Sequence, residues 1–270
     1  MKYANRILLS DIDGTLLDSR GKLSKRNRAA IEYFIAEGGR FGIATGRGVK
    51  NAAVALPDIP VNFHSIFLNG SLLYHPETEE VVQTVLLDQA RILPVVQTSL
   101  SIEPTISMQV YTPLDGYFVS EERHTDKVFV KEHAPYGFAE LDAVTGYNWT
   151  KVLFNGTPEQ LKWVEGHVAP LKAQGLVDSV YSCPYYYEVL PAGSNKGTMV
   201  KHIQRTKGKD DIVYAVGNYY NDAEMIQAAD VGFFTENAPD DLKAISDGVC
   251  PSCDQDAIAD VIYHRIACVE

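Results

Sequence analysis

Short apolar runs that end abruptly in polar residues recur along this chain, and this pattern constrains its fold more than any other feature. Residues 7–9 form the first run, and the polar segment DIDGT follows at once. Residues 41–44 form a second run that precedes Thr45, and residues 66–68 form a third that precedes Asn69. Unbroken apolar runs of this length are typical of strands buried on both faces. The carboxylates of DIDGT are therefore expected at the end of a buried strand.

A helix is expected between the first two strands. Ser24 can cap a helix over about residues 25–37, whose apolar residues fall on one stripe, and two glycines follow it. Near the end of the chain, residues 212–216 form another short buried strand, followed by GNYYND. Alternating strands and helices with polar strand exits predict an α/β fold with a doubly wound parallel sheet, of the Rossmann-like kind. Ligands of such a sheet gather at the carboxyl ends of its strands.

The pattern changes from about residue 87. A helix-like segment is followed by alternating stretches at 108–111 and 117–119, by a strand at 151–154, and by the capping box that begins at Thr157. This order is typical of an α+β lobe with an antiparallel sheet. Residues 185–190 are then expected to form a strand and residues 195–204 a helix. The α/β pattern of the first part of the chain resumes after them. We expect one core domain from residues 1–84 and 190–270, with residues 85–189 inserted as a cap domain.

Composition excludes several classes of protein. The formal net charge is −11, and no run of Lys or Arg suits a nucleic-acid backbone, so no nucleic-acid partner is expected. No apolar stretch approaches the length of a membrane span or a signal peptide, so we expect no membrane association and a cytoplasmic location. The oligomeric state does not follow from the sequence.

The cysteines and histidines do not predict a metal centre. Cys250 and Cys253 form a CxxC, but neither a second CxxC nor a closely spaced His pair completes a zinc site. Cys183 and Cys268 lie far away, so reduced structural thiols are expected. The histidines show no metal-like clustering; they are His64, His75, His124, His133, His167, His202 and His264.

The DIDGT segment has the residues for acid, base and nucleophilic chemistry. Asp11 and Asp13 are two apart on an extended segment, so both side chains can point to the same side. One carboxylate can attack phosphorus to give an aspartyl-phosphate, and the other can protonate the leaving alcohol and then take a proton from water. A bare DxD is often only an acidic turn, but its place directly after a buried strand favours the functional interpretation.

Two further residues suit a phosphate site. Thr45 can donate its hydroxyl and backbone N–H to a phosphoryl oxygen, although an ordinary helix cap explains it equally well. Lys196 stands at a predicted helix start, where its ammonium can neutralise an aspartate and a phosphate together. A surface lysine is the simpler alternative.

Taken in order, the segments DIDGTLLD, ATGR, SNKG and GNYYND resemble the signature of the haloacid dehalogenase (HAD) superfamily. The Asn69-Gly70 pair and the position of the insert resemble the subfamily with a type IIB cap, the Cof-like phosphatases. The resemblance implies a Mg²⁺-dependent phosphatase acting on a small phosphate ester. It also implies a role for each matching residue: catalytic Asp11, Asp13, Thr45 and Lys196, substrate-binding Gly46, Arg47, Asn69 and Asn221, and metal-binding Asp11, Asp13, Asn218 and Asp222.

The chain departs from the family at Asn218, where the family usually has a metal-binding aspartate. An amide oxygen can bind Mg²⁺, but it brings no negative charge to a hard cation. Weak metal binding is one consequence. Loss of catalysis is the other, and it defines an alternative function, that of a phosphosugar-binding or regulatory protein.

The resemblance leaves the substrate open. A sugar phosphate is the expected class, and a phosphomutase of the same fold is a further alternative. Tyr219 and Tyr220 lie beside the fourth motif, but tyrosines in such positions are as often packing residues. The run of tyrosines at 185–187 is expected to form a strand and is assigned to no site.

Overall fold

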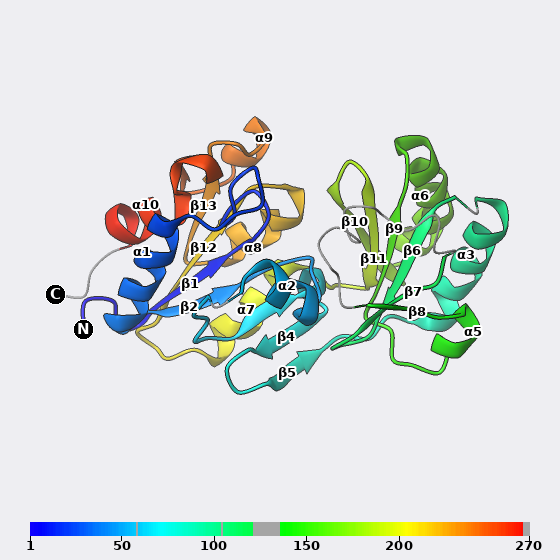
Figure 1. The fold of residues 1–270 in the computed structure, drawn as a ribbon, viewed down its shortest axis with the longest axis horizontal. Coiled ribbons are helices and arrows are strands. Elements are labelled where there is room, and N and C mark those ends of the chain that lie inside the picture. Colours follow the sequence, from blue (N-terminus) through cyan, green and yellow to red (C-terminus); the bar gives the residue numbers. More distant parts are fainter. Residues whose placement is uncertain (58, 104, 121–135, 267–270) are drawn as a thin grey trace. The chain divides into compact units, whose positions relative to one another are not determined.

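The computed structural model describes residues 1–57, 59–103, 105–120 and 136–266 (Figure 1). The chain forms two compact units. The first comprises Met1–Thr45, Leu56–Gln83 and Asn195–Glu270, and the second comprises Gly46–Ala55 and Thr84–Ser194. Both ends of the chain therefore contribute to the first unit.

A five-stranded parallel sheet forms the centre of the first unit. Its order is β14-β13-β12-β1-β2. The strands are β1 (Arg6–Ser10), β2 (Arg40–Ile43), β12 (Ile212–Gly217), β13 (Val231–Thr235) and β14 (Gly248–Cys250). Leu8 and Leu9 are wholly buried, as expected for a strand covered on both faces. The predicted parallel α/β fold is confirmed.

The helices of this unit cover both faces of the sheet. α1 (Lys25–Ala36) leads from β1 to β2, and α8 (Ala223–Ala228) leads from β12 to β13 in the opposite direction along the sheet. Because parallel crossovers are right-handed, the two helices lie on opposite faces. α10 (Ala257–Asp260) packs on α1, and α7 (Lys196–Thr206) packs on α8. The strand order reverses between β1 and β12, which places a ligand crevice at their carboxyl ends.

Short elements complete this unit. α9 is Asp240–Lys243, and the remaining turns are η3 (Tyr220–Asp222), η4 (Cys253–Gln255) and η5 (Val261–Arg265). Ser24 caps α1 as predicted, accepting a hydrogen bond from the Asn27 N–H at 3.0 Å.

The third predicted strand does not extend the parallel sheet. β3 (Ser65–Phe67) belongs to a separate three-stranded sheet with β4 (Leu72–His75) and β5 (Glu80–Thr84), and it pairs with β4 in antiparallel fashion. An isolated parallel bridge, between Ala44 and Ile66, connects it to the end of β2. An apolar run shows that a strand is buried but does not identify its partner.

Gly70 allows a left-handed loop to lie against the start of α7. The loop is η1 (Leu68–Gly70), in which Leu68, Asn69 and Gly70 have φ angles of 53°, 51° and 94°. A Cβ on Gly70 would lie 2.1 Å from the Asn195 carbonyl oxygen. Only glycine fits this approach of one backbone to another.

We expect Gly70→Ala to destabilise the protein by roughly 2–4 kcal/mol, because it adds both an overlap with rigid backbone and strain at positive φ. The measurement is urea unfolding followed by circular dichroism. Gly166→Ala is the matched control. Gly166 lies inside a helix of the second unit with open space around its Cβ position, so alanine there should be neutral or stabilising. Equal midpoints for the two variants would contradict this account of Gly70.

The second unit is a six-stranded sheet with two long helices. The strand order is β10-β11-β9-β6-β7-β8, antiparallel except between β7 and β8. The strands are β6 (Ser107–Tyr111), β7 (Gly116–Phe118), β8 (Gly137–Phe138), β9 (Lys151–Asn155), β10 (Val177–Cys183) and β11 (Tyr186–Pro191), and the helices are α2 (Val49–Ala55), α3 (Gln89–Ile102), α5 (Leu141–Val144) and α6 (Pro158–Ala173). The apolar core of this unit contains Met108, Val152 and Val189 from the sheet, together with residues of α3 and α6.

The other face of this sheet carries buried charged residues, Lys151 and Glu188. The Lys151 ammonium lies 3.0 Å from the Glu188 carboxylate and donates to the Gly46 carbonyl oxygen at 2.6 Å. Lys50 pairs with Asp115 at 2.8 Å. These contacts explain why Gly46–Ala55 groups with the second unit. The predicted division into residues 1–84 with 190–270 and residues 85–189 stays a prediction.

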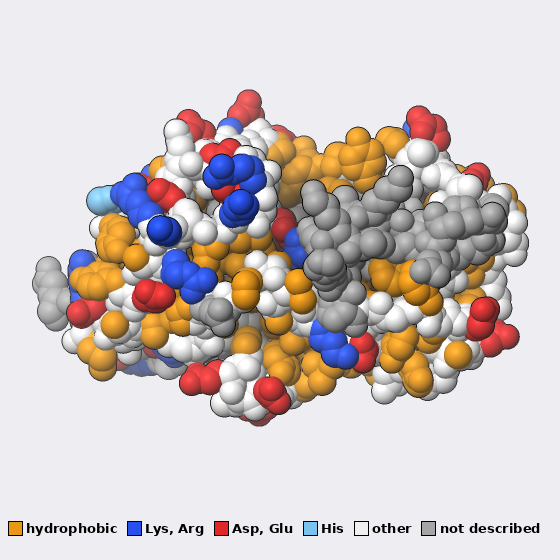
Figure 2. Space-filling view, in the orientation of Figure 1, with side chains coloured by type: hydrophobic (Ala, Val, Ile, Leu, Met, Phe, Trp, Pro, Cys, Tyr) orange, Lys and Arg blue, Asp and Glu red, His pale blue; other side chains and the backbone are white. Residues whose placement is uncertain are grey.

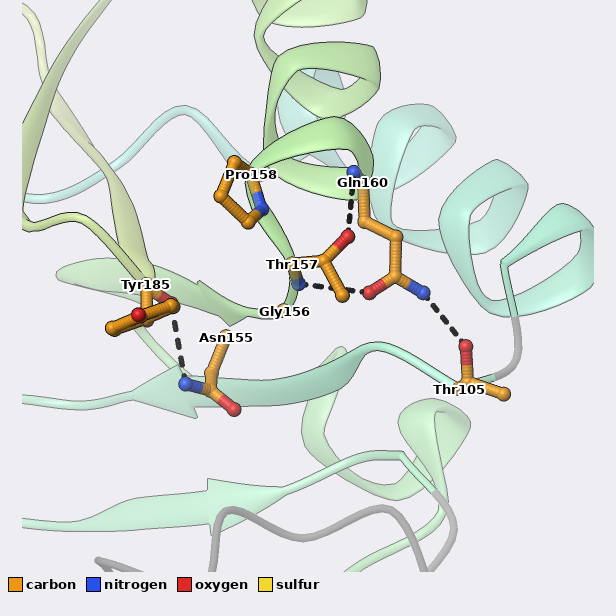
Figure 3. Close-up of a pocket in the computed structure, with 7 residues that line it drawn as sticks. All are labelled: Thr105, Asn155, Gly156, Thr157, Pro158, Gln160 and Tyr185. Carbon is orange, nitrogen blue, oxygen red and sulfur yellow. Dashed lines mark hydrogen bonds between the residues drawn. The ribbon is translucent and has the colours of Figure 1, made fainter.

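Figure 3 shows an open pocket at the start of α6. Its polar groups bond mainly to one another: Asn155 donates to the Tyr185 carbonyl at 3.2 Å, and Gln160 donates to the Thr105 hydroxyl at 2.7 Å. The predicted capping box of Thr157 and Gln160 is present. These polar groups are engaged with one another and with the helix cap, so we assign this pocket no function.

Surface charges of both signs alternate on the face shown in Figure 2. In the first unit, Arg20 pairs with Asp18 at 2.7 Å and Arg26 with Asp256 at 3.8 Å. The described residues on this face present a mixed surface rather than a continuous basic stripe. No helix among the described residues is long and apolar enough to cross a membrane.

Candidate active site

Asp11 lies at the carboxyl end of β1, where the strand order reverses. Its backbone N–H donates to the Val216 carbonyl oxygen of β12 at 2.9 Å, which extends the pairing of the two strands by one residue. Its side chain is only 8% exposed. A carboxylate buried to this extent needs partners that compensate for its lost hydration.

Lys196 supplies that compensation from the first turn of α7. Its ammonium lies 2.8 Å from Asp11 Oδ1 and 2.6 Å from Asp222 Oδ1, and Lys196 and Asp222 are wholly buried. The simpler alternative of a surface lysine is therefore wrong. Asn195 caps the helix, with its side chain accepting from the Thr198 N–H at 2.8 Å.

The turn after β12 holds Asp222 in place. Asp222 Oδ2 accepts hydrogen bonds from the backbone N–H groups of Asn218, at 2.8 Å, and Tyr219, at 3.0 Å. Both oxygens of this carboxylate are thus engaged with Lys196 and the turn. The predicted metal-binding role of Asp222 stays a prediction, and the geometry favours a different one, the orientation of Lys196.

Burial and charge shift the pKa values of this cluster. Burial raises the pKa of Asp11 to about 7; the charge of Lys196 opposes that shift, while Asp222 and Asp13 add to it. Burial alone would lower the pKa of Lys196, but Asp11 and Asp222 outweigh it and raise that pKa above its usual value. Lys196 is therefore protonated at neutral pH, and it favours the ionised form of Asp11.

Asp13 is exposed beside this buried cluster, whereas Ile12 between the two aspartates is wholly buried. Gly14 then turns the chain with a φ of 77°. The Asn237 amide donates to the Gly14 carbonyl at 2.9 Å and accepts from the Cys253 N–H at 3.0 Å. Asn237 thus helps to hold the DIDGT loop, and no motif in the sequence identified it.

Thr45 and Asn69 meet where β2 and β3 end. The Thr45 N–H donates to Ile66 at 2.8 Å, and the Asn69 N–H donates to the Thr45 carbonyl at 3.1 Å. The Asn221 amide donates to Asn69 Oδ1 at 3.0 Å. Two residues expected to bind substrate are therefore bonded to each other, and their contact with substrate stays a prediction.

Gly46 and Arg47 belong to the second unit, where Arg47 donates to Asn51 Oδ1 at 2.5 Å. Their predicted contact with substrate also stays a prediction. In the first unit the rings of Tyr219 and Tyr220 lie edge to face with centroids 5.1 Å apart, and Tyr220 is 46% exposed.

The residues around Asn218 are suitable ligands for a divalent cation. One terminal atom of its side-chain amide lies 3.1 Å from the Asp13 carbonyl oxygen, 3.1 Å from Thr15 Oγ1 and 3.2 Å from Asp11 Oδ2. Oxygen atoms of this kind are the ligands that Mg²⁺ prefers, and Mg²⁺ commonly keeps several of its waters. Within the described ranges no group of three or more His, Cys, Asp or Glu side chains has metal-site geometry, so any site here depends on carbonyl and amide oxygens as well.

No thiol or imidazole among the described residues joins a metal-like cluster of side chains here. Cys250 and Cys253 are free thiols, and burial raises the pKa of Cys250 to about 12. Cys268, His124 and His133 lie outside the described residues.

Comparison with known proteins identifies the family. A model of haloacid dehalogenase-like hydrolases matches residues 8–262. The chain is 26% identical over 273 residues to the putative phosphatase YxeH of Bacillus subtilis, covering 97% of this chain and 98% of that protein. It is also 28% identical over 277 residues to the Arabidopsis thaliana chloroplastic endoribonuclease YBEY, covering 95% of this chain but only 46% of that longer protein.

Among solved structures, the subclass IIB sugar phosphatase BT4131 superposes with a TM-score of 0.79 at 20% identity, covering 96% of this chain and 98% of that one. This likeness is one of fold, and it confirms the expected HAD fold with a type IIB cap. The match over residues 8–262 and the full-length relatives give the same result: this chain belongs to the haloacid dehalogenase-like hydrolase family.

Proposed function

We propose that this protein is a Mg²⁺-dependent phosphatase that hydrolyses a small sugar phosphate through an aspartyl-phosphate at Asp11. The family is one of hydrolases, and relatives such as YxeH are named as putative phosphatases. The observation that carries the proposal is the buried Lys196, which bridges Asp11 and Asp222 at the carboxyl ends of the sheet. The charge of Lys196 favours the ionised form of the nucleophile and supplies positive charge for a phosphoryl group.

The proposed hydrolysis has two half-reactions, formation of the aspartyl-phosphate and its hydrolysis. In the first, a carboxylate oxygen of Asp11 bonds to phosphorus, the bond from phosphorus to the ester oxygen breaks, and Asp13 gives its proton to the departing alkoxide. In the second, water attacks phosphorus, Asp13 takes a proton from that water, and the Asp11 carboxylate leaves. The exposure of Asp13 suits a group that must reach both leaving alcohol and water.

Thr45 and the bound metal would act on the phosphoryl oxygens. Thr45 is proposed to donate a hydrogen bond to one of them. Asp11 Oδ2, the Asp13 carbonyl and the Asn218 amide oxygen would hold the cation, which supplies charge neutralisation in the transition state. With a neutral amide in the set, metal binding is expected to be weaker than at a site that has a carboxylate there.

The substrate assignment is tested with a panel of phosphorylated metabolites, measuring phosphate release with Mg²⁺ and with EDTA. Release from sugar phosphates that requires Mg²⁺ supports the proposal. Asn218 also favours a second candidate, a phosphosugar-binding protein without turnover. Tight binding of a sugar phosphate with no release under any metal condition would establish that alternative, and transfer of phosphate within one sugar would indicate a mutase.

Asp13→Asn should slow both half-reactions by about 10²–10⁴-fold, the usual loss for a general acid and base. The measurement is single-turnover phosphate release together with the amount of phosphorylated protein. Asp240→Asn is a matched control at an exposed carboxylate that contacts only Lys243 in the described structure, and it should behave as wild type. Activity of Asp13→Asn within twofold of wild type would remove Asp13 from its proposed role.

A further inference from the structure

The orientation of the Asn218 amide bears on how Asp11 is held. Its backbone is fixed by the bond from its N–H to Asp222, so only the side chain is free to adjust. One terminal atom of the amide faces Asp11 Oδ2, the Asp13 carbonyl oxygen and Thr15 Oγ1, at 3.1–3.2 Å. The first two have no proton to donate when Asp11 is ionised. In the metal-free protein, the hydrogen-bond network therefore places the amide nitrogen, not the oxygen, at this point.

With the nitrogen inward, both oxygens of Asp11 accept from a donor. Lys196 bonds to Oδ1 at 2.8 Å, and the Asn218 amide bonds to Oδ2 at 3.2 Å. The amide also ties the Asp13 carbonyl, and hence the turn at Gly14, to the end of β12. There is little room beside it, since a Cβ on Gly14 would lie 2.6 Å from the outer terminal atom of the amide.

An aspartate at position 218 would have the opposite effect in the metal-free protein. Its carboxylate would place a further acceptor and a further negative charge beside Asp11 and the Asp13 carbonyl. A cation bound between these oxygens would offset their repulsion. Rotation of the amide by about 180° about its Cβ–Cγ bond exchanges its oxygen and its nitrogen. The amide can therefore donate a hydrogen bond when no cation is present and present an oxygen ligand when one is bound.

We infer that Asn218 is a positioning residue with two orientations. Its amide nitrogen holds Asp11 and the DIDGT turn in the metal-free protein, and its amide oxygen faces the cation when one is bound. The metal-free site is therefore preassembled, and each binding event must first break the amide contacts to Asp11 and to the Asp13 carbonyl oxygen. The Thr15 hydroxyl, 3.1 Å away, can accept from the amide nitrogen in one orientation and donate to the amide oxygen in the other. The part that concerns the cation rests on the proposed function, whereas the part that concerns the metal-free protein does not.

The test is thermal unfolding of wild type, Asn218→Asp and Asn218→Ala, each in EDTA and in a series of Mg²⁺ concentrations. In EDTA, Asn218→Asp should unfold about 3–8 °C below wild type, because it loses the amide contacts and gains charge repulsion. Mg²⁺ should raise its midpoint more than that of wild type, and at lower concentrations. Asn218→Ala should be destabilised in EDTA, with little recovery in Mg²⁺.

Asn221→Asp is the matched control for adding a charge to this turn, because the Asn221 amide bonds to Asn69 rather than to Asp11. Any loss of stability in this control should not be restored selectively by Mg²⁺. If Asn218→Asp in EDTA is as stable as wild type, or if Mg²⁺ stabilises both equally, the inference is wrong.

A second readout follows the amide directly. In ¹⁵N NMR spectra of the metal-free protein, the side-chain NH₂ signal of Asn218, identified by its absence in Asn218→Ala, should show slow hydrogen exchange. It should shift on addition of Mg²⁺ while the Asn221 signal changes less. An Asn218 signal that is solvent-exchanged and insensitive to Mg²⁺ contradicts the inference. Neither readout depends on turnover, so failure of the proposed phosphatase activity would be seen separately.

Discussion

Asp11→Asn is expected to lower phosphatase activity by at least about 10⁴-fold, because the amide cannot form an acyl phosphate and no neighbouring carboxylate can replace it. Asp222 is engaged with Lys196 and two backbone N–H groups, and Asp13 is exposed outside the buried cluster. The measurement is steady-state phosphate release, with trapping of phosphorylated protein by acid quench. Wild type should give a trapped phosphoprotein and the variant none. Full activity in the variant would contradict the mechanism.

The same variant should be more stable than wild type above neutral pH when metal is absent. Burial raises the pKa of Asp11 from 3.8 to about 7, so the folded state holds a proton that the unfolded state has lost. Stability from this protonation is complete below about pH 4 and is lost as pH rises to about 7. Asn at position 11 does not titrate. The melting temperature of Asp11→Asn minus that of wild type should therefore increase as the pH rises from about 4 to about 7 and stay constant above that.

Melting temperatures of the two proteins in EDTA, at pH 5 and pH 8, test this sign. Asp240→Asn provides the control, because Asp240 is exposed. This substitution should change the melting temperature by the same amount at pH 5 and at pH 8. A variant that is less stable than wild type at pH 8 would show that Lys196 compensates fully for the burial of Asp11.

Lys196→Met is expected to cause the largest loss of stability, about 3–5 kcal/mol, because it leaves two buried carboxylates without their shared cation. For a chain of this size such a loss corresponds to a fall in melting temperature of about 6–20 °C. Activity should be lost as well. Thermal unfolding in EDTA measures the stability effect independently of catalysis.

Two comparisons identify the cause. Lys243→Met removes a partly exposed lysine that pairs with the exposed Asp240, and it should change stability by less than about 1 kcal/mol. The double variant of Lys196→Met with Asp11→Asn removes one of the two unpaired charges, so it should be more stable than Lys196→Met alone. If the double variant is the less stable protein, the loss comes from packing of the lysine stem rather than from charge.

The local elements, and the end of the sheet at which the chemistry lies, could be predicted from the order of residues along the chain. Apolar runs located β1, β2 and β12 within one residue, and cap residues such as Ser24 and Thr157 located helix starts. These features depend on neighbours along the chain, which is why they can be read without a structure. The positions of Asp11 and Lys196 in the site followed from the same patterns together with the resemblance to a family.

Which of these groups meet, and how, depends on the packing of segments that are distant in the sequence. Lys196 reaches Asp11 across 185 residues of sequence, and Asp222 is oriented toward it by two backbone N–H groups. The membership of β3 in a separate sheet and the orientation of the Asn218 amide likewise depend on distant partners. Periodicity and spacing give the direction of a side chain relative to its own backbone. Whether it becomes a ligand, a donor or a buried charge depends on atoms a few ångströms away that belong to other segments of the chain.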